Sequence, residues 1–276
     1  MDTANVARTS RVQLHVEDTG GNGRPVVLIH GWPLSSESWA AQIPALRDAG
    51  FRVVAYDRRG FGRSEKPEDG YDYATLADDL AGLMVDLDLQ NTVLVGFSMG
   101  GGEVARYVRL HGQDRLGGVV FASAVTPCLM QSPDNPHGPL TPEKAEEKAA
   151  ALKADRHAYF DTFTRNFFSV DGKLQVEESQ RQAAIGICLQ SNQVAALGCM
   201  HAFSTSDFRD DLKRIRVPAL VLHGDSDAVV PFEGSGALTH ATIEHSALHV
   251  LKHAPHGCNI SHADAFNAAL LGFLRN

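Results

Sequence analysis

The sequence lacks any block of lysines and arginines, and its 33 acidic residues outnumber its 25 basic ones, which gives a formal net charge of -8. A nucleic-acid-binding protein needs a basic surface to neutralise phosphates, so we expect no nucleic-acid partner. The chain also lacks the roughly 18 uninterrupted apolar residues of a membrane-spanning helix, so we expect no membrane span. Residues 1–10 contain no apolar run resembling a signal peptide, and we therefore expect a cytoplasmic protein.

Cysteine is also scarce, and its copies are too scattered to form a CxxC pair or a zinc-binding pattern. The thiols are at Cys128, Cys188, Cys199 and Cys258. Cysteines without such spacing are typical of reduced, buried side chains. We therefore expect free thiols and no bound metal.

Apolar runs of strand length recur towards both ends of the chain. We interpret seven stretches as strands: 11–18, 25–30, 51–56, 92–97, 117–123, 218–224 and 248–253. Most are continuously apolar, as parallel strands covered on both faces should be. The first, RVQLHVED, alternates apolar and polar residues and predicts a half-buried edge strand. Leucines at helical spacing over 73–89 predict an intervening helix, and this alternation predicts a parallel α/β sheet.

The alternation stops between residues 126 and 211, where we find no convincing strand. This stretch begins as a proline-rich turn and continues as helical sequence. We predict a core made of 1–125 and 212–276 and an inserted helical cap made of 126–211. Such an insertion can act as a lid that shapes an active site. An accessory helical layer without a gating role is the equally open alternative.

A glycine-rich turn, GFSMGGGE, overlaps the end of the apolar run 92–97. It lacks the third-position glycine of a dinucleotide-binding fingerprint, and Glu103 stands where a phosphate-binding loop would need a lysine. The five residues GFSMG, centred on Ser98, do match the GxSxG turn that holds a nucleophilic serine between a strand and a helix. The sharp bend leaves no room for side chains two residues either side of the serine. The sequence therefore predicts Ser98 as a nucleophile.

A nucleophilic serine needs a base within hydrogen-bond reach and an acid that orients the base. On this type of turn, the acid and then the histidine follow the serine along the chain. Asp225 and Asp227 both follow a predicted strand; we select Asp227, because Asp225 directly follows a glycine and is placed to hold the turn. Of the three histidines near the end, His253 ends a strand and His262 begins a helix. His256 lies in a loop flanked by proline and glycine, and we predict it as the base.

Two backbone amides are expected to stabilise the oxyanion that the reaction would form. The first belongs to Met99, directly after the nucleophile. The second comes from the loop HGWP after the run 25–30, and we assign it to Trp32 because Pro33 has no amide hydrogen. The Trp32 indole either lines the pocket or packs in the core, and both readings stay open.

These segments together resemble the α/β-hydrolase superfamily over nearly the whole chain. The matching motifs are VVLIHGWP, YDRRGFGRS, GFSMGGGE, HGDSD and HAPHG. More narrowly, HGWPLSSESW, VVAYDRRGFGRSEKP, GFSMGGGEVARY and APHGCNISHADAFN look like the cofactor-free (non-haem) haloperoxidases. The resemblance implies a mostly parallel eight-stranded sheet flanked by helices, with the helical cap inserted after the sixth strand.

The same resemblance implies an activity. Members of this family are serine esterases that also act as perhydrolases. It implies a triad of Ser98, Asp227 and His256, with Trp32 and Met99 as oxyanion donors. An acyl-enzyme formed from a small carboxylic ester would be cleaved by water or by hydrogen peroxide, and peroxide would give a peracid that oxidises halide. No cofactor is implied; the implied partners are the ester, peroxide and further copies of the chain.

Pro33 and Val229 are further pocket residues that the resemblance implies. In the family, a proline beside the oxyanion donor is associated with peroxide use because it changes where a backbone carbonyl points. A cis bond between Trp32 and Pro33 is one of the two forms open to it. The family usually has phenylalanine where Trp32 stands, which bears on the size of the acyl pocket. The turn at 57–59 fits a structural role, and we assign it no chemistry.

Other classes of function remain open. Lactonases, lactamases and carbon–carbon bond hydrolases of the same fold use the same three residues. A non-catalytic hydrolase-fold protein that binds a ligand is a further alternative, although such proteins tend to lose a member of the triad. Haloalkane dehalogenases and epoxide hydrolases are disfavoured, because they need a carboxylate where Ser98 stands.

Overall fold

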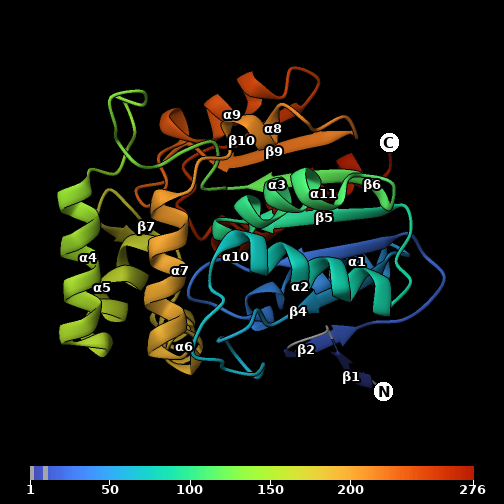
Figure 1. Ribbon diagram of the computed structural model, residues 1–276, viewed down its shortest axis with the longest axis horizontal. Coiled ribbons are helices and arrows are strands. Elements are labelled where there is room, and N and C mark those ends of the chain that lie inside the picture. The colour runs from blue at the N-terminus through green and yellow to red at the C-terminus, as the bar shows by residue number, and fades with distance from the viewer. Residues whose placement is uncertain (1–2, 9–11) are drawn as a thin grey trace.

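The computed structural model describes residues 3–8 and 12–276 and is built around an eight-stranded sheet (Figure 1). The order across the sheet is β1-β2-β4-β3-β5-β6-β9-β10. In chain order the strands are β1 (Thr3–Arg8), β2 (Gln13–Asp18), β3 (Pro25–Ile29), β4 (Arg52–Tyr56), β5 (Thr92–Phe97), β6 (Leu116–Ala122), β9 (Ala219–Gly224) and β10 (Ala247–Leu251). β2 is antiparallel to both of its neighbours, and the pairs from β4 to β10 are parallel. The predicted mostly parallel sheet is thus confirmed.

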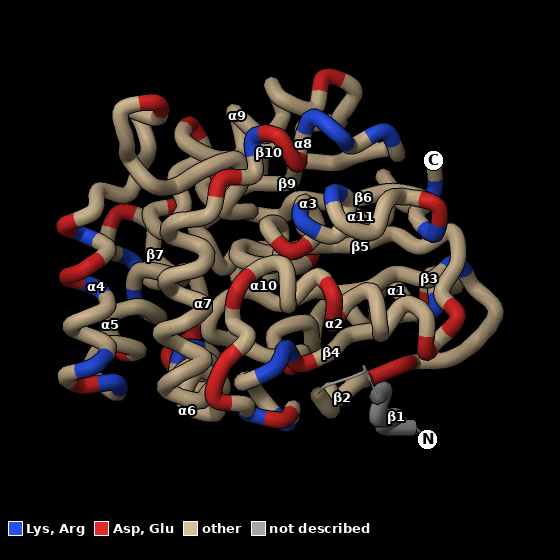
Figure 2. Tube along the Cα trace, in the orientation of Figure 1, with Lys and Arg blue, Asp and Glu red and all other residues tan. Residues whose placement is uncertain are grey.

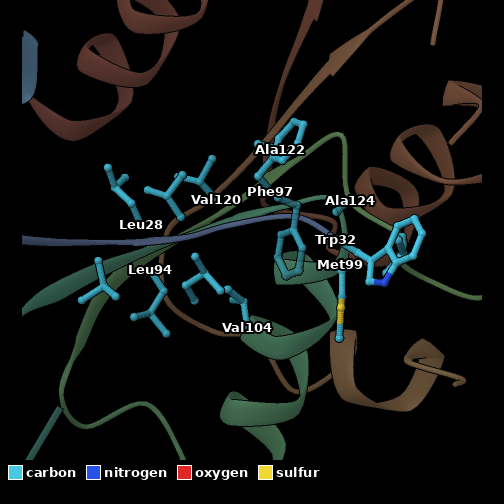
Figure 3. Packing of buried hydrophobic residues seen from close by; sticks show 14 of the residues in the cluster. Leu28, Trp32, Leu94, Phe97, Met99, Val104, Val120, Ala122 and Ala124 are labelled. Carbon is cyan, nitrogen blue, oxygen red and sulfur yellow. The ribbon is translucent and has the colours of Figure 1, made fainter. Parts of the chain in front are cut away.

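The continuously apolar sequences form the central strands because helices flank the sheet. Every residue of β5 and of β9 is buried, as is β3 after its first residue. Leu28 and Val120 extend the buried core on one face of the sheet, and Leu94 of the strand between them does so on the other face (Figure 3). The helices outside the β6–β9 connection are η1 (Ser36–Trp39), α1 (Gln42–Asp48), α2 (Tyr73–Asp86), α3 (Met99–His111), η2 (Phe232–Gly234), α9 (Gly236–Thr242), α10 (Cys258–Ser261) and α11 (Ala263–Leu274). α2 packs against α3, and α1 packs against α11.

The prediction that residues 11–18 form an edge strand was wrong. β2 lies inside the sheet edge, because β1 pairs with it on the side away from β4. The sequence of β1 is TANVAR, in which valine is the only large apolar residue. A strand with so little hydrophobic content gives no alternating pattern from which it could be recognised.

The connection from β6 to β9 carries the predicted helical insertion, which lies beside one end of the sheet (Figure 1, left). Its elements are α4 (Pro142–Ala154), α5 (Arg156–Phe168), β7 (Ser169–Val170), β8 (Lys173–Leu174), α6 (Glu178–Gln190), α7 (Gln193–Thr205) and α8 (Arg209–Leu212). The expectation of no strand here was wrong, because β7 and β8 form a small antiparallel hairpin. Asp171 and Gly172 join them with φ angles of 50° and 75°, as a tight Asp-Gly turn requires. The division into core and cap stays a prediction, and its boundary at 211/212 falls inside α8.

The remaining global features concern charge, thiols and apolar helices. Lysines and arginines are interspersed with acidic residues along the described chain (Figure 2). All four cysteines are free and buried, as predicted. Among the described helices, no single one is long and apolar enough to cross a membrane; α6 and α7 reach that length only as a pair bent by 100°.

Candidate active site

Ser98 lies at the sharp turn between β5 and α3, where the sequence predicts a nucleophile. Its backbone is strained, with φ 55° and ψ -117°, in a region that non-glycine residues rarely adopt. A Cβ atom on Gly96 would lie 2.4 Å from the carbonyl oxygen of Gly100, and one on Gly100 would lie 2.5 Å from that of Ile29. Both glycines are therefore needed for the chain to pass this closely. Ser98 is 6% exposed and lines a cavity.

The structure brings Ser98, His256 and Asp227 into one line of hydrogen bonds. Nε2 of His256 lies 2.9 Å from Oγ of Ser98, and Nδ1 lies 2.6 Å from Oδ2 of Asp227. An ionised Asp227 accepts only from a protonated Nδ1, which leaves Nε2 of a neutral ring to accept the serine proton. The rings of Phe97 and Phe167 pack on the imidazole with centroids 5.3 and 5.1 Å away. The imidazole is thus held in position and shielded from water.

Asp227 is buried, yet its surroundings favour the charged form. Burial alone would raise the pKa of this carboxyl, but the charge of His256 and hydrogen bonds from His223 and His256 outweigh it, and the pKa is lowered. Oδ1 accepts hydrogen bonds from the amides of Val229 and Val230 at 2.9 and 2.8 Å. The acid is therefore fixed at both oxygens and ionised at neutral pH.

His223, at the end of β9, is a residue of this site that sequence reasoning missed. Its Nε2 lies 2.9 Å from the carbonyl oxygen of Val230 and 3.3 Å from Oδ2 of Asp227, and the ring is fully buried. The only signal available is its place just before the GDSD segment. Sequence spacing alone does not show that a residue four positions before an aspartate points back at it.

The aspartate and the histidines that were set aside have other partners. Oδ1 of Asp225 accepts from the amide of His253 at 2.7 Å and from the hydroxyl of Ser226 at 3.1 Å, so it ties the turn after β9 to the segment after β10. His262 bonds with the neighbouring Ser261. None of these groups reaches Ser98 through a bond that the described residues form.

The two predicted oxyanion donors belong to two different segments next to Ser98, the start of α3 and the loop after β3. Met99 is the first residue of α3, so its amide has no partner one turn earlier in the helix. Trp32 lies in the loop after β3, and within residues 3–8 and 12–276 its amide donates to no protein acceptor. A Cβ atom on Gly31 would lie only 3.0 Å from the Cβ atom of Ser98, so this loop approaches the serine closely.

The indole of Trp32 both lines the cavity and packs against the insertion. Its Nε1 donates to the carbonyl oxygen of Ala196 in α7 at 2.8 Å. Its ring makes edge-to-face contacts with four aromatic residues of α5 and α7, namely Tyr159, Phe160, Phe163 and Phe203. The bond between Trp32 and Pro33 is cis. Pro33 is not among the described residues that line the cavity, whereas Val229 is.

A buried polar network fixes the loop that carries Trp32. His30 has Nδ1 2.8 Å from the carbonyl oxygen of Gly31, and its Nε2 accepts from the amide of Arg58 at 2.9 Å. Arg58 in turn pairs with Glu103 of α3 at 2.8 Å. Burial, together with the charge of Arg58, lowers the pKa of His30 to about 3. The neutral imidazole therefore donates at one nitrogen and accepts at the other. Because Arg58 is engaged by His30 and Glu103, the turn at 57–59 helps to hold this loop in place.

The cavity above Ser98 has a volume of about 250 Å³ and is walled mainly by apolar side chains. Its wall combines residues of the sheet edge with residues of α4, α5 and α7. The sequence left open whether the insertion shapes the site or is an accessory layer, and here it lines the cavity. Its lining residues include Lys148, Tyr159, Phe163, Asn166 and Phe203, which the sequence did not single out individually. Among the described residues, no group of three or more His, Cys, Asp or Glu side chains is arranged to hold a metal ion.

A strained serine after a central parallel strand, with an acid and a histidine after later strands, defines a class of proteins, and the family comparison agrees. The family model for the alpha/beta hydrolase fold matches residues 24–263, and the chain belongs to this family. Within it, the chain is 40% identical to a non-heme chloroperoxidase of Kitasatospora aureofaciens, over 92% of this chain and 93% of that protein.

Two further relatives support the narrower resemblance. A bifunctional esterase/perhydrolase of Acinetobacter calcoaceticus is 37% identical, with 96% of this chain and 97% of that protein covered. The crystal structure of a bromoperoxidase from Bacillus anthracis superposes with a TM-score of 0.96 at 48% identity, covering 99% of this chain and 100% of the other. The predicted kinship with non-haem haloperoxidases is thus confirmed.

Proposed function

We propose that this protein is a serine hydrolase of small carboxylic esters that works through an acyl-enzyme on Ser98. The observation that carries the proposal is the relay from Ser98 Oγ to His256 Nε2 at 2.9 Å and from His256 Nδ1 to Asp227 Oδ2 at 2.6 Å. Such a relay turns a weak hydroxyl nucleophile into a strong one. The esterase named among the relatives is consistent with it.

The acylation half of the reaction follows from the positions of these atoms. Ser98 Oγ attacks the ester carbonyl carbon while its proton passes to His256 Nε2. The negative charge that develops on the carbonyl oxygen is stabilised by the amides of Met99 and Trp32. When the tetrahedral intermediate collapses, the ester C–O bond breaks and His256 gives its proton to the departing alcohol. Asp227 stays ionised and stabilises the imidazolium between these two transfers.

Deacylation repeats the sequence with a second nucleophile. His256 takes a proton from water, the resulting hydroxide attacks the acyl carbon, and the carboxylic acid leaves as Ser98 regains its proton. Hydrogen peroxide in place of water gives a peracid by the same proton transfers. The peracid would then oxidise halide in solution, which accounts for haloperoxidase names among the relatives without a cofactor. The role of Pro33 in this choice stays a prediction.

A lactone is a cyclic ester, so a lactonase is the second candidate. An enol-lactonase from Burkholderia xenovorans has a structure that matches with a TM-score of 0.87 at 26% identity over 99% of this chain. The relay described above would open a lactone by the same acylation step. Only the fate of the alcohol differs, because it stays attached to the acyl group.

Replacement of the nucleophile tests the proposal. We expect Ser98→Ala to lower kcat/KM for p-nitrophenyl acetate by at least about 10³-fold and to abolish peracid formation equally, because both need the acyl-enzyme. Ser206→Ala, at the end of α7 and away from the relay, is the matched control and should retain activity. Wild-type protein as inert as Ser98→Ala would favour a ligand-binding protein, and halogenation that survives Ser98→Ala would contradict the mechanism.

A further inference from the structure

One cation lies at the cavity that contains Ser98, on the first helix of the insertion. Lys148 of α4 lines this cavity, and it is the only lysine or arginine among the described residues that do so. The residue is exposed overall, so it lies at the rim rather than in the depth. The wall that it shares with Ser98 and His256 is otherwise mostly apolar. A charge on this wall can act on a ligand that is bound at Ser98.

Lys148 has no counter-ion within the part of the chain that the structure describes. It forms no ion pair or hydrogen bond there, and no aspartate or glutamate lines the cavity. On α4 the positions one turn away are held by Lys144, Ala145, Ala151 and Leu152, none of which is acidic. The glutamates of α4, at positions 143, 146 and 147, are not at this spacing from it, and both signs of charge follow the helix (Figure 2).

The neighbouring helices do not supply an anion either. α5 and α7 are the helices that pack on α4. On α5, Asp161 is engaged by Arg181 at 2.8 Å, and α7 contains no acidic residue. Although Lys148 is exposed as a residue, protein groups around its ammonium partly exclude water and lower its pKa, and the like charge of Lys144 lowers it further. An anion that binds beside this ammonium would therefore stabilise its charged form.

Neutral hydrogen-bonding groups of α5 share this wall. Thr162 and Asn166 line the cavity, and the structure gives their side chains no hydrogen bonds within the described residues. Lys148 and Thr162 are equally far along the chain from Asp155, at which α4 ends and α5 begins. In a hairpin of two helices, such residues lie at about the same level. A cation that shares a cavity wall with amide and hydroxyl groups lacking protein partners is a combination that suits a carboxylate.

We propose that Lys148 selects esters that carry a carboxylate at the end remote from the reacting carbonyl. The inference rests on the proposed esterase function and names its substrate class: half-esters of dicarboxylic acids, or lactones with a carboxylate side chain. The ester group lies at Ser98 within the apolar wall, and the carboxylate pairs with the Lys148 ammonium at the rim. Because the pair is the same in the ground state and the transition state, Lys148 acts mainly on KM.

Matched substrates test this. Monomethyl esters of dicarboxylic acids, from succinic to suberic, are compared with methyl esters of monocarboxylic acids of equal chain length, and released methanol is measured. We expect wild type to have the higher kcat/KM for the acid-ended member of at least one pair. Lys148→Gln should lower that ratio about fivefold through KM, the size expected of a solvent-accessible ion pair, and added salt should lower it in wild type.

Two further variants make the comparison specific. Lys148→Arg keeps the charge and should keep the preference, and Lys144→Gln, one turn away and not lining the cavity, should leave the ratio unchanged. If wild type hydrolyses neutral esters but Lys148→Gln leaves the ratio unaltered, the role of Lys148 is overturned and the esterase function stands. If wild type hydrolyses neither series, both proposals fail.

Discussion

Neighbouring backbone atoms leave no room for a side chain at the two glycines that flank Ser98 in its motif. The atoms nearest to a Cβ on Gly96 or Gly100 belong to rigid backbone rather than to flexible side chains, so nothing can move aside cheaply. The strained backbone of Ser98 is held in place by the strand before it and the helix after it. The motif is therefore a steric requirement as well as a chemical one.

Two alanine substitutions for glycine should consequently have opposite effects. We expect Gly96→Ala to lower the free energy of unfolding by about 1–3 kcal/mol and to lower esterase activity, because its Cβ would overlap the Gly100 carbonyl. Gly186→Ala is the matched control inside α6, where nothing lies within 4 Å of the added atom. It should raise the free energy of unfolding by about 0.5–1 kcal/mol. Urea denaturation measures both, and a similar loss in the two variants would contradict the argument.

The predictability of the site differs from residue to residue. Ser98, Asp227 and His256 could be selected because a local motif marks the serine and the chain order of the others is constrained. His223 could not, because its position against Asp227 depends on how the chain after β9 folds back. Lys148 could not either, because nothing in the sequence of an exposed helix says which of its residues faces a cavity.

At the scale of elements, Trp32 joins the loop after β3 to the helices of the insertion. Its indole donates to α7 and contacts aromatic rings of α5 and α7, while its own amide is the proposed oxyanion donor. The side chain thus closes one wall of the cavity and connects the insertion to the reacting centre. The two readings left open by the sequence, pocket wall and core packing, both describe this residue.

Replacing this indole should therefore change both stability and substrate size. We expect Trp32→Phe to lower the free energy of unfolding by about 1–2 kcal/mol, since it loses the bond to Ala196 and some packing. We also expect kcat/KM for p-nitrophenyl esters to shift towards longer acyl chains, because the cavity is larger. Trp39→Phe is the control: that indole nitrogen has no partner among the described residues, and the ring does not line the cavity. An identical chain-length profile in wild type and Trp32→Phe would remove Trp32 from the acyl pocket.

The elements themselves were predictable where hydrophobic pattern decides them. β3, β5, β6 and β9 are buried on both faces, so their apolar runs mark them in the sequence. β1 and the β7–β8 hairpin are too polar or too short to form a pattern. The helix predicted over 73–89 ends earlier, at Asp86, because Asp88 adopts a left-handed φ of 44°. Local backbone geometry of this kind is settled by the fold around it.

At the scale of the whole molecule, one buried histidine links stability to pH. The pKa of His30 falls from 6.5 to about 3 on folding, because burial and the neighbouring Arg58 disfavour its protonation. Between these values the unfolded chain binds a proton that the folded chain excludes. The free energy of unfolding must then decrease as the pH falls through this window, by at most about 1.4 kcal/mol per pH unit from this group.

A histidine replacement should reduce that dependence. We expect His30→Asn to flatten the fall of the unfolding midpoint between pH 6.5 and 4, even if the variant is less stable at every pH because the amide of Arg58 loses its acceptor. His157→Asn, on the exposed side of α5, should keep the wild-type slope. Thermal denaturation followed by circular dichroism at several pH values gives both slopes, and parallel curves for wild type and His30→Asn would exclude His30 as the origin.

The insertion leaves the sheet after β6 and returns at β9, and these two strands pair directly with each other. A segment anchored at two adjacent strands can lengthen, shorten or change its sequence while the register of the sheet, and with it the setting of the nucleophile, is preserved. Most of the helical wall of the cavity thereby belongs to a segment that can diverge while the sheet is kept. Positions that contact the reacting centre, such as Phe167 on the His256 ring, have to be retained in such an exchange. For protein engineering, this makes the stretch between β6 and β9 the natural place to exchange between relatives when a new acyl preference is wanted.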